Sequence, residues 1–295
     1  MTKASHENQS AGTTVIDDAA VAAPVTGADT PSGERVRRGF WGRWGMTEQR
    51  VYVAISVIGF LTVWEVASQL GWIRPLFFSS PTAVFAAAIR EITGPNFWNN
   101  LRVSMLAFSI GFSLAIALSI PLGLMFGWFR RLGHFFDPWL RFFYATPRIT
   151  YIPLLVLWFG LGLESKIALV FAGPFITILV GTLEGVRTVP TTYLDVARSY
   201  GAKQFQFFKS VLLPTTVPFI LAATRLAVGI GIVAIVLGEM YASQAGIGHM
   251  LMQAAHNLQA DRVLFAVLLL TILGVGLSKI LLAIENRVAD WKPQT

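Results

Sequence analysis

The reactive side chains of this sequence do not form the groupings that catalytic or metal sites require. The sequence has no cysteine, which excludes disulfides, iron–sulfur clusters, thiolate zinc sites and cysteine nucleophiles. His134, His249 and His256 are scattered without ligand spacing, so no metal site is expected. No Gly-Lys dipeptide occurs, so the sequence contains no phosphate-binding loop for ATP. We expect no catalytic residue and no cofactor.

A few charged residues within or beside apolar stretches are candidates for a different kind of site. Arg148 and Arg225 could line a path and attract an anionic substrate, or their side chains could extend to lipid phosphates. Glu239 could gate such a path, contact a docked partner or cap a helix end in water. Glu65 lies near the end of its apolar stretch, where water or a neighbouring residue can satisfy its carboxylate. The sequence leaves these alternatives open.

The composition indicates an integral membrane protein. The chain has 295 residues, of which 54% are hydrophobic and 13% charged, and its mean hydropathy is +0.60. A soluble domain usually has about 25% charged residues, so this chain has too few to cover a water-facing surface. The net charge of +7 could suggest nucleic acid. In so apolar a chain, however, Lys and Arg usually mark the cytoplasmic ends of membrane spans, so we expect contact with lipid and no nucleic-acid partner.

Six apolar stretches are candidate spans, since about 20 helical residues cross a hydrocarbon core of roughly 30 Å. They are Val51–Leu70, Val103–Phe126, Pro147–Leu163, Ile167–Leu183, Thr216–Gly238 and Val263–Ile284. The third and fourth are the shortest. The predicted fold is an all-α membrane protein with six transmembrane helices.

The distribution of Lys and Arg predicts the orientation of these spans. If the N-terminal tail is cytoplasmic, most Lys and Arg outside the spans lie in inner segments, as the positive-inside rule requires. An even number of spans then places both termini in the cytoplasm. Residues 1–45 lack large apolar runs and are predicted to be a disordered cytoplasmic tail.

The inner segment from Glu184 to Pro214 is polar but regularly patterned. Pro190 can begin a helix in which Tyr193, Ala197 and Tyr200 recur at helical spacing. Gly201 is the residue expected at a left-handed C-terminal cap. A second amphipathic run, Lys203–Leu213, places Phe205, Phe208 and Leu212 on one face before Pro214. The segment is therefore predicted to be two short cytoplasmic helices joined at Gly201.

This segment resembles the EAA loop of binding-protein-dependent ABC importer permeases. The pattern is Asp195-Val196-Ala197, three residues, Gly201, nine residues, then Val211-Leu212-Leu213-Pro214. It departs from the family's Glu-Ala-Ala and Ile-x-Leu-Pro only at Asp195, Val196 and Val211. Three further stretches resemble the branch for nitrate, sulfonates, taurine and thiamine precursors: Ile152–Gly160, Ser165–Ile167 and Gly238–Gly248.

The resemblance implies an import channel that has no ATPase domain of its own and depends on a separate ATPase chain. It covers roughly residues 50–292, so we assign residues 46–292 to a permease domain. The resemblance places this domain in the cytoplasmic membrane. The implied partners are a cytoplasmic ATPase dimer, an extracytoplasmic substrate-binding protein and a second permease subunit, most simply an identical copy. Residues implied to couple to the ATPase are Tyr193, Asp195, Val196, Ala197, Gly201, Leu213 and Pro214. Candidates for the substrate path are Arg148, Arg225, Gly229 and Glu239, although glycines such as Gly229 also serve close helix packing.

Two other classes of membrane protein fit the sequence less well. A secondary transporter needs intramembrane acidic groups and usually repeated halves. Only Glu65 is acidic within the six predicted spans, and no internal repeat is found. An intramembrane protease needs paired aspartates, an H-E-x-x-H motif or a Ser/His pair in its spans, and these are absent from the sequence.

Overall fold

Every regular element in the described part of the chain is helical, which confirms the predicted all-α class. The computed structural model describes residues 46–72, 74 and 77–288. The predicted disordered tail, residues 1–45, lies outside this part. The chain divides into two compact units, Met1–Val57 and Ile58–Thr295. Of the first unit, only the beginning of helix α1 is described, so the packing below concerns the second unit.

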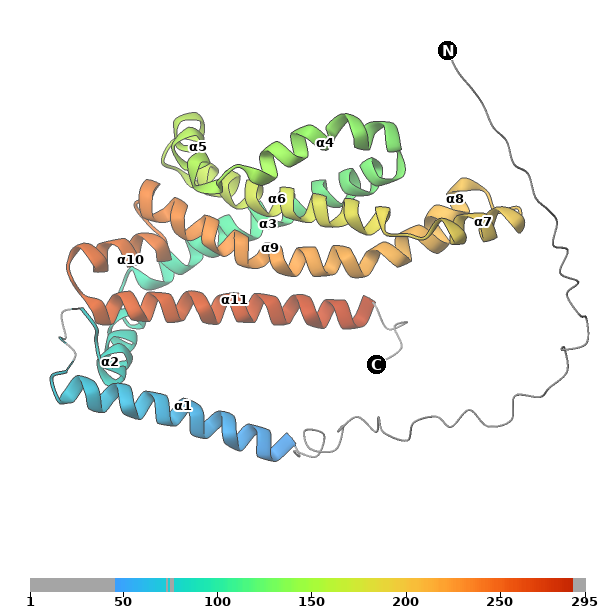
Figure 1. Cartoon of the computed structure of the whole chain (residues 1–295). Helices are drawn as coiled ribbons and strands as arrows, with labels where there is room; N and C mark the ends of the chain where they lie inside the picture. Colours follow the sequence, from blue (N-terminus) through green and yellow to red (C-terminus); the bar gives the residue numbers. More distant parts are fainter. Residues whose placement is uncertain (1–45, 73, 75–76, 289–295) are drawn as a thin grey trace, which may run out of the picture. The chain divides into compact units, whose positions relative to one another are not determined.

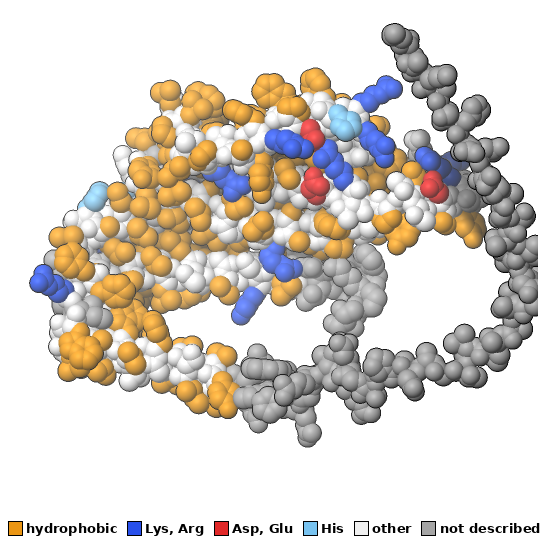
Figure 2. Space-filling view, in the orientation of Figure 1, with side chains coloured by type: hydrophobic (Ala, Val, Ile, Leu, Met, Phe, Trp, Pro, Cys, Tyr) orange, Lys and Arg blue, Asp and Glu red, His pale blue; other side chains and the backbone are white. Residues whose placement is uncertain are grey.

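Five of the described helices are long and apolar enough to cross a membrane. They are α1 (Met46–Gln69), α3 (Phe97–Trp128), α6 (Leu163–Arg187), α9 (Leu213–Ala242) and α11 (Ala260–Val288). Figure 1 shows their arrangement. Hydrophobic side chains cover most of the visible surface in Figure 2, and many large ones are exposed, as lipid contact requires. These helices correspond to five of the six predicted spans.

The predicted third span, Pro147–Leu163, is not one straight helix. It contains a 3₁₀ turn, η1 (Arg148–Thr150), and the nine-residue helix α5 (Tyr151–Phe159). At 1.5 Å per residue α5 is only about 14 Å long. The preceding helix α4 (Arg130–Ala145) meets this segment at a bend of 86°. The described chain therefore has five spanning helices, or six spans if the bent pair counts as one.

Helices α3 and α6 run parallel and pack closely at glycines. Gly111 of α3 lies against Val170 of α6, and further along Gly127 lies against Val186. A Cβ atom at either glycine would clash with the facing valine. If both helices cross the membrane, the chain between them has to return to the side where α3 begins. The bent α4–α5 pair is the segment available for that return.

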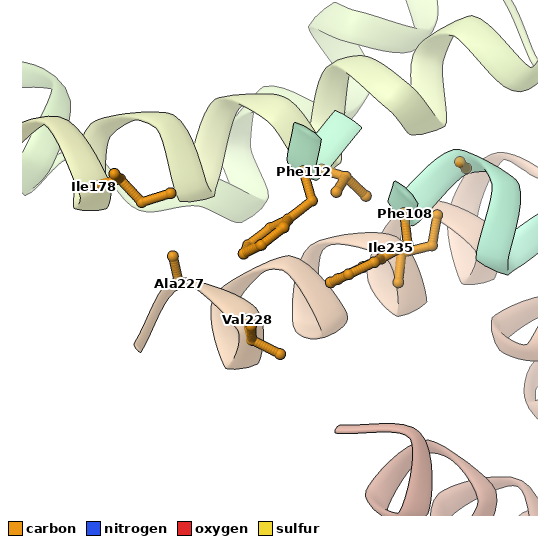
Figure 3. Close-up of a cluster of buried hydrophobic side chains, with 8 residues drawn as sticks. Phe108, Phe112, Ile178, Ala227, Val228 and Ile235 are labelled. Atoms are coloured by element: carbon orange, nitrogen blue, oxygen red, sulfur yellow. The ribbon is translucent and has the colours of Figure 1, made fainter. Parts of the chain in front are cut away.

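The core of the second unit lies where α3, α6 and α9 meet. Figure 3 shows Phe108 and Phe112 of α3 beside Ile178 of α6 and Val228 of α9. The two phenylalanine rings stack at 5.2 Å. Helix α9 runs antiparallel to α6. Gly173 of α6 faces Ile230 of α9, whereas Gly185, later in α6, faces Phe219, earlier in α9. This three-helix core supports the segments at both ends.

Short helices lie at opposite ends of α9. At its beginning are α7 (Thr191–Ser199), α8 (Gln204–Phe207) and a π-helical turn, η2 (Phe208–Leu212). At its end is α10 (Ile247–His256), which packs with α9 and α11. Helix α2 (Pro81–Ile92) packs against α11, and buried side chains of α2, α10 and α11 form one cluster. The predicted coupling loop and the α2–α10 layer are thus separated by the length of α9 (Figure 1).

Candidate functional site

The end of α7 is a left-handed glycine cap, as the sequence predicts. Gly201 has φ +70°, and no atom lies within 4 Å of the position that its Cβ would occupy. Its N–H donates to the Arg198 carbonyl at 2.9 Å, and the Ala202 N–H donates to the Ala197 carbonyl at 3.0 Å. These two bonds form a Schellman motif, which satisfies the last carbonyls of the helix. The direction of the chain after α7 therefore depends on the backbone of Gly201.

Helix α7 has an inward and an outward apolar face. Leu194 and Ala197 pack against a buried cluster centred on Phe207. Tyr193, Val196 and Tyr200 point outward, with 52%, 51% and 87% of their surface exposed. Ala197, which the sequence places at helical spacing with Tyr193 and Tyr200, therefore belongs to the packed face. Val196 takes its place in the exposed stripe.

The segment after Gly201 departs from the predicted amphipathic helix. Its beginning is held by the Lys203 N–H, which donates to the Gln206 side chain at 2.8 Å. A π-helical turn follows, in which the Leu213 N–H donates five residues back to the Phe208 carbonyl. Phe205, predicted to share one face with Phe208 and Leu212, is exposed, and Phe207 is buried in its place. The π turn places Phe207 and Leu212, five residues apart, in one cluster.

Two cavities contain three of the four residues predicted to line a substrate path. A cavity of about 210 Å³ is lined by Arg148 and Gly229. A second, of about 670 Å³, is lined by Gly229, Arg225 and Lys279. Sequence reasoning missed Lys279, although a cation inside the sixth apolar stretch was a visible signal. Gly229, Val233 and Leu237 line both cavities, and a Cβ atom at Gly229 would meet nothing within 4 Å.

The smaller cavity combines apolar walls with two polar groups. The Arg148 guanidinium donates to the Thr177 hydroxyl at 3.1 Å. Tyr151 lines the same cavity, and its hydroxyl is buried without a hydrogen-bond partner among the described residues. A buried unpartnered hydroxyl calls for an explanation such as a ligand or water. A cation and a hydroxyl in an apolar cavity could hold a small anion with a short apolar body.

Glu239 lies outside the lining of these two cavities, and its environment excludes one of the three alternatives that the sequence left open. It is 0% exposed, so it does not cap a helix end in water. The Ser104 hydroxyl donates to its carboxylate at 2.7 Å, and the Gly248 N–H donates at 2.9 Å. The Ser104 oxygen in turn accepts the Ile247 N–H at 2.9 Å. Glu239 therefore fixes the first turn of α10 against α3 and α9.

A buried lysine accompanies this network. Lys166 of α6 is 4% exposed, and its ammonium donates to the Ala245 carbonyl at 2.8 Å. The Gly246 N–H donates to the Asn100 side chain at 3.0 Å. The turn between α9 and α10 is thus held from both α3 and α6. Sequence reasoning missed Ser104, Lys166 and Asn100, because their partners lie far along the chain.

Glu65 has a structural explanation. Its carboxylate accepts the Thr82 hydroxyl at 2.8 Å, the Thr82 N–H at 3.1 Å and the Gln69 amide at 2.9 Å. Together with the Ser80 hydroxyl, which accepts the Ala83 N–H, it caps the beginning of α2. The interpretation that a neighbouring residue satisfies Glu65 is confirmed.

Replacing Glu239 by alanine should destabilise the protein strongly. The change leaves the Ser104 hydroxyl and the Gly248 N–H without an acceptor, and each unsatisfied buried group costs about 1–3 kcal/mol. We expect a loss of about 2–5 kcal/mol, measured as a lower thermal unfolding temperature in detergent. Glu164→Ala is the matched control, because Glu164 is exposed at the start of α6. Equal unfolding temperatures for the two variants would contradict the structural role of Glu239.

Comparisons with known proteins agree with the fold and with the resemblance of the loop. Residues 119–290 match the family described as binding-protein-dependent transport system inner membrane component. The taurine transport system permease protein TauC of Escherichia coli is 30% identical over 261 residues, covering 86% of this chain and 94% of TauC. The putative aliphatic sulfonates transport permease protein SsuC of Bacillus subtilis is 26% identical over 275 residues, covering 93% and 97%.

A solved structure shows the same fold. A chain of the inward-facing MetNI methionine ABC transporter superposes with a TM-score of 0.52 and 19% identity, covering 68% of this chain and 95% of that one. At this identity the likeness concerns the fold alone. The family match spans more than half of the chain, and the relatives align over nearly all of their length. The chain therefore belongs to the binding-protein-dependent transport system inner membrane component family, as an ABC importer permease of the taurine, sulfonate and thiamine-precursor branch.

Proposed function

We propose that this permease takes its energy from a separate cytoplasmic ATPase dimer that contacts the outward face of α7. The observation that carries the proposal is the exposed apolar stripe of Tyr193, Val196 and Tyr200 on a helix whose other face is anchored in the fold. An exposed stripe of large apolar side chains is typical of a helix that docks into a groove. Asp195 and Arg198, beside the stripe, would add polar contacts at its rim.

The proposed substrate is a small sulfonate-like anion. The relatives TauC and SsuC are named for taurine and for aliphatic sulfonates. The cavity lined by Arg148, Tyr151 and Gly229 supports the same class, since it offers a cation and an unpartnered hydroxyl between apolar walls. Arg148 would attract the sulfonate oxygens while the apolar walls accept the short carbon chain. An extracytoplasmic binding protein would deliver the anion.

The proposed working unit contains two copies of this chain, each crossing the membrane six times with both termini in the cytoplasm. The parallel course of α3 and α6 supports a sixth crossing by the bent α4–α5 pair. The cavity of about 670 Å³ along α9 and α11 is open at the surface of the single chain and would form part of a path between two copies. A two-fold dimer is the commonest arrangement for such a chain.

Reconstitution tests this function. The chain is placed in vesicles with a candidate ATPase and a candidate binding protein from the same organism, and uptake of radiolabelled taurine and short alkanesulfonates is followed. We expect uptake that requires internal ATP and both partner proteins. Uptake by this chain alone, driven by a proton or sodium gradient, would instead make it a secondary transporter.

A further inference from the structure

A cavity of about 500 Å³ lies on the inward side of α7, where none of the residues assigned to the substrate path is found. One wall is the corner between α3 and α4, which contains Trp128, Arg130 and Arg131. Leu194 and Arg198 of α7 and Phe207 of α8 also line the cavity. This α3–α7 cavity has the volume of an ordinary ligand pocket.

The cavity has a cationic side that the fold does not neutralise. No carboxylate of the described residues lies within ion-pair distance of Arg130 or Arg131. The nearby carboxylate of Asp137 is engaged by Arg187 at 2.9 Å. Arg198 meets Asp195 only at 3.6 Å and in solvent, a contact of small energetic value. Lys and Arg side chains gather over the end where α4 and α7 lie (Figure 2).

The cavity also has an aromatic and apolar part in its lining. The Trp128 indole stacks on Phe207 with centroids 6.0 Å apart and meets Phe208 edge-on at 5.4 Å. Leu212 and Val186 complete the wall. A cavity lined by both arginines and aromatic side chains fits a ligand that has both an anionic and an apolar part. Inorganic phosphate would leave the apolar wall empty, and a neutral alcohol would leave the arginines unpaired.

We propose that the α3–α7 cavity binds an anionic amphiphile, in which a phosphate or sulfonate group is joined to an apolar stem. Two sources have this chemistry: an anionic phospholipid of the inner leaflet and an organic sulfonate on the cytoplasmic side. Because α7 forms one wall, an occupied cavity supports α7 from behind and fixes its angle. This consequence rests on the proposed coupling function, whereas binding itself does not require the ATPase.

The test uses the full chain in phosphatidylcholine nanodiscs without any partner. Tryptophans are replaced by 5-fluorotryptophan, and the ¹⁹F signal of Trp128 is assigned with Trp128→Phe. The sample is titrated with hexanesulfonate in one series, and phosphatidylglycerol is incorporated in another. Hexanol and inorganic phosphate are the probes that have only one of the two parts.

We expect saturable shifts of the Trp128 signal with hexanesulfonate, with phosphatidylglycerol or with both, and the arm that responds identifies the source. Arg130→Gln combined with Arg131→Gln should weaken binding by roughly tenfold or more. Arg141→Gln, an exposed arginine on α4 outside the cavity, should leave binding unchanged. No shift in either arm, an equal response to hexanol, or binding that ignores the double substitution would overturn the proposal. Failure of ATP-driven uptake with intact binding would count against the coupling function alone.

Discussion

Replacing Gly201 by valine should nearly abolish ATP-driven uptake while the protein still reaches the membrane. Gly201 has φ +70°, where an L-residue costs roughly 1–2 kcal/mol and a β-branched residue fits poorly. The added side chain meets no neighbour, so the strain is confined to the backbone. The chain would relieve it by opening the Schellman motif, which changes the angle of α7. A strain of this size lowers the correctly oriented population by roughly 5–30-fold, and uptake should fall accordingly.

Gly71→Val is the matched control for this change. Gly71 has φ +74° and equally open space, but it follows α1 and lies outside the coupling loop. Uptake is measured in vesicles, and ATP hydrolysis is compared with and without loaded binding protein. Gly71→Val should transport like the parent protein. If Gly201→Val also transports like the parent at equal expression, α7 is not the coupling element.

Replacing Gly229 by leucine should block transport without harming the fold. Gly229 lines both path cavities, and its Cβ position is open. A leucine side chain would therefore fill space next to Arg148 instead of clashing with a helix. Removing glycine from a helix interior is itself stabilising by about 0.5–1 kcal/mol. We expect uptake to fall by about tenfold or more, which corresponds to roughly 1.4 kcal/mol, while thermal unfolding is unchanged or shifts upward.

Gly276→Leu is the corresponding control on α11. Its Cβ position is also open, and Gly276 lines neither path cavity. The control should transport normally and show the same small gain in stability. Equal uptake by both variants would remove Gly229 from the path, whereas equal loss would point to a general effect of crowding the helices.

The long helices could be predicted because a hydropathy pattern shows how long each stretch of the sequence is and how apolar its residues are. The third span could not, since Pro147–Leu163 is apolar enough but is interrupted by a turn at its beginning and by Gly160, with φ +76°, near its end. The sixth crossing proposed above would use a bent pair whose first helix, α4, carries arginines and was not counted as apolar. A hydropathy pattern contains no information about such a bend.

The spacing of the motif was enough to predict the coupling helix. It was not enough to predict which side chains of that helix face the fold and which face solvent. Gly201 was identifiable because a left-handed cap has a strong local preference for glycine. Which apolar residues of α7 face inward depends on Phe207, whose position is set by the π turn after it. Glu239 is a similar case, since its partner Ser104 lies 135 residues away in the sequence. Local patterns predicted the elements, and contacts distant in sequence decided which side chains are exposed.

Site-directed crosslinking to the ATPase tests most directly the claim that the outward face of α7 is the coupling surface. The natural sequence has no cysteine, so Val196→Cys and Ala197→Cys give single reactive positions on adjacent residues. A short bifunctional reagent is applied to the complex with an ATPase that carries cysteines in its surface grooves. We predict that Val196→Cys crosslinks and Ala197→Cys, on the packed face, does not. Crosslinking at Ala197→Cys alone, or at neither position in a complex that transports, would contradict the assignment.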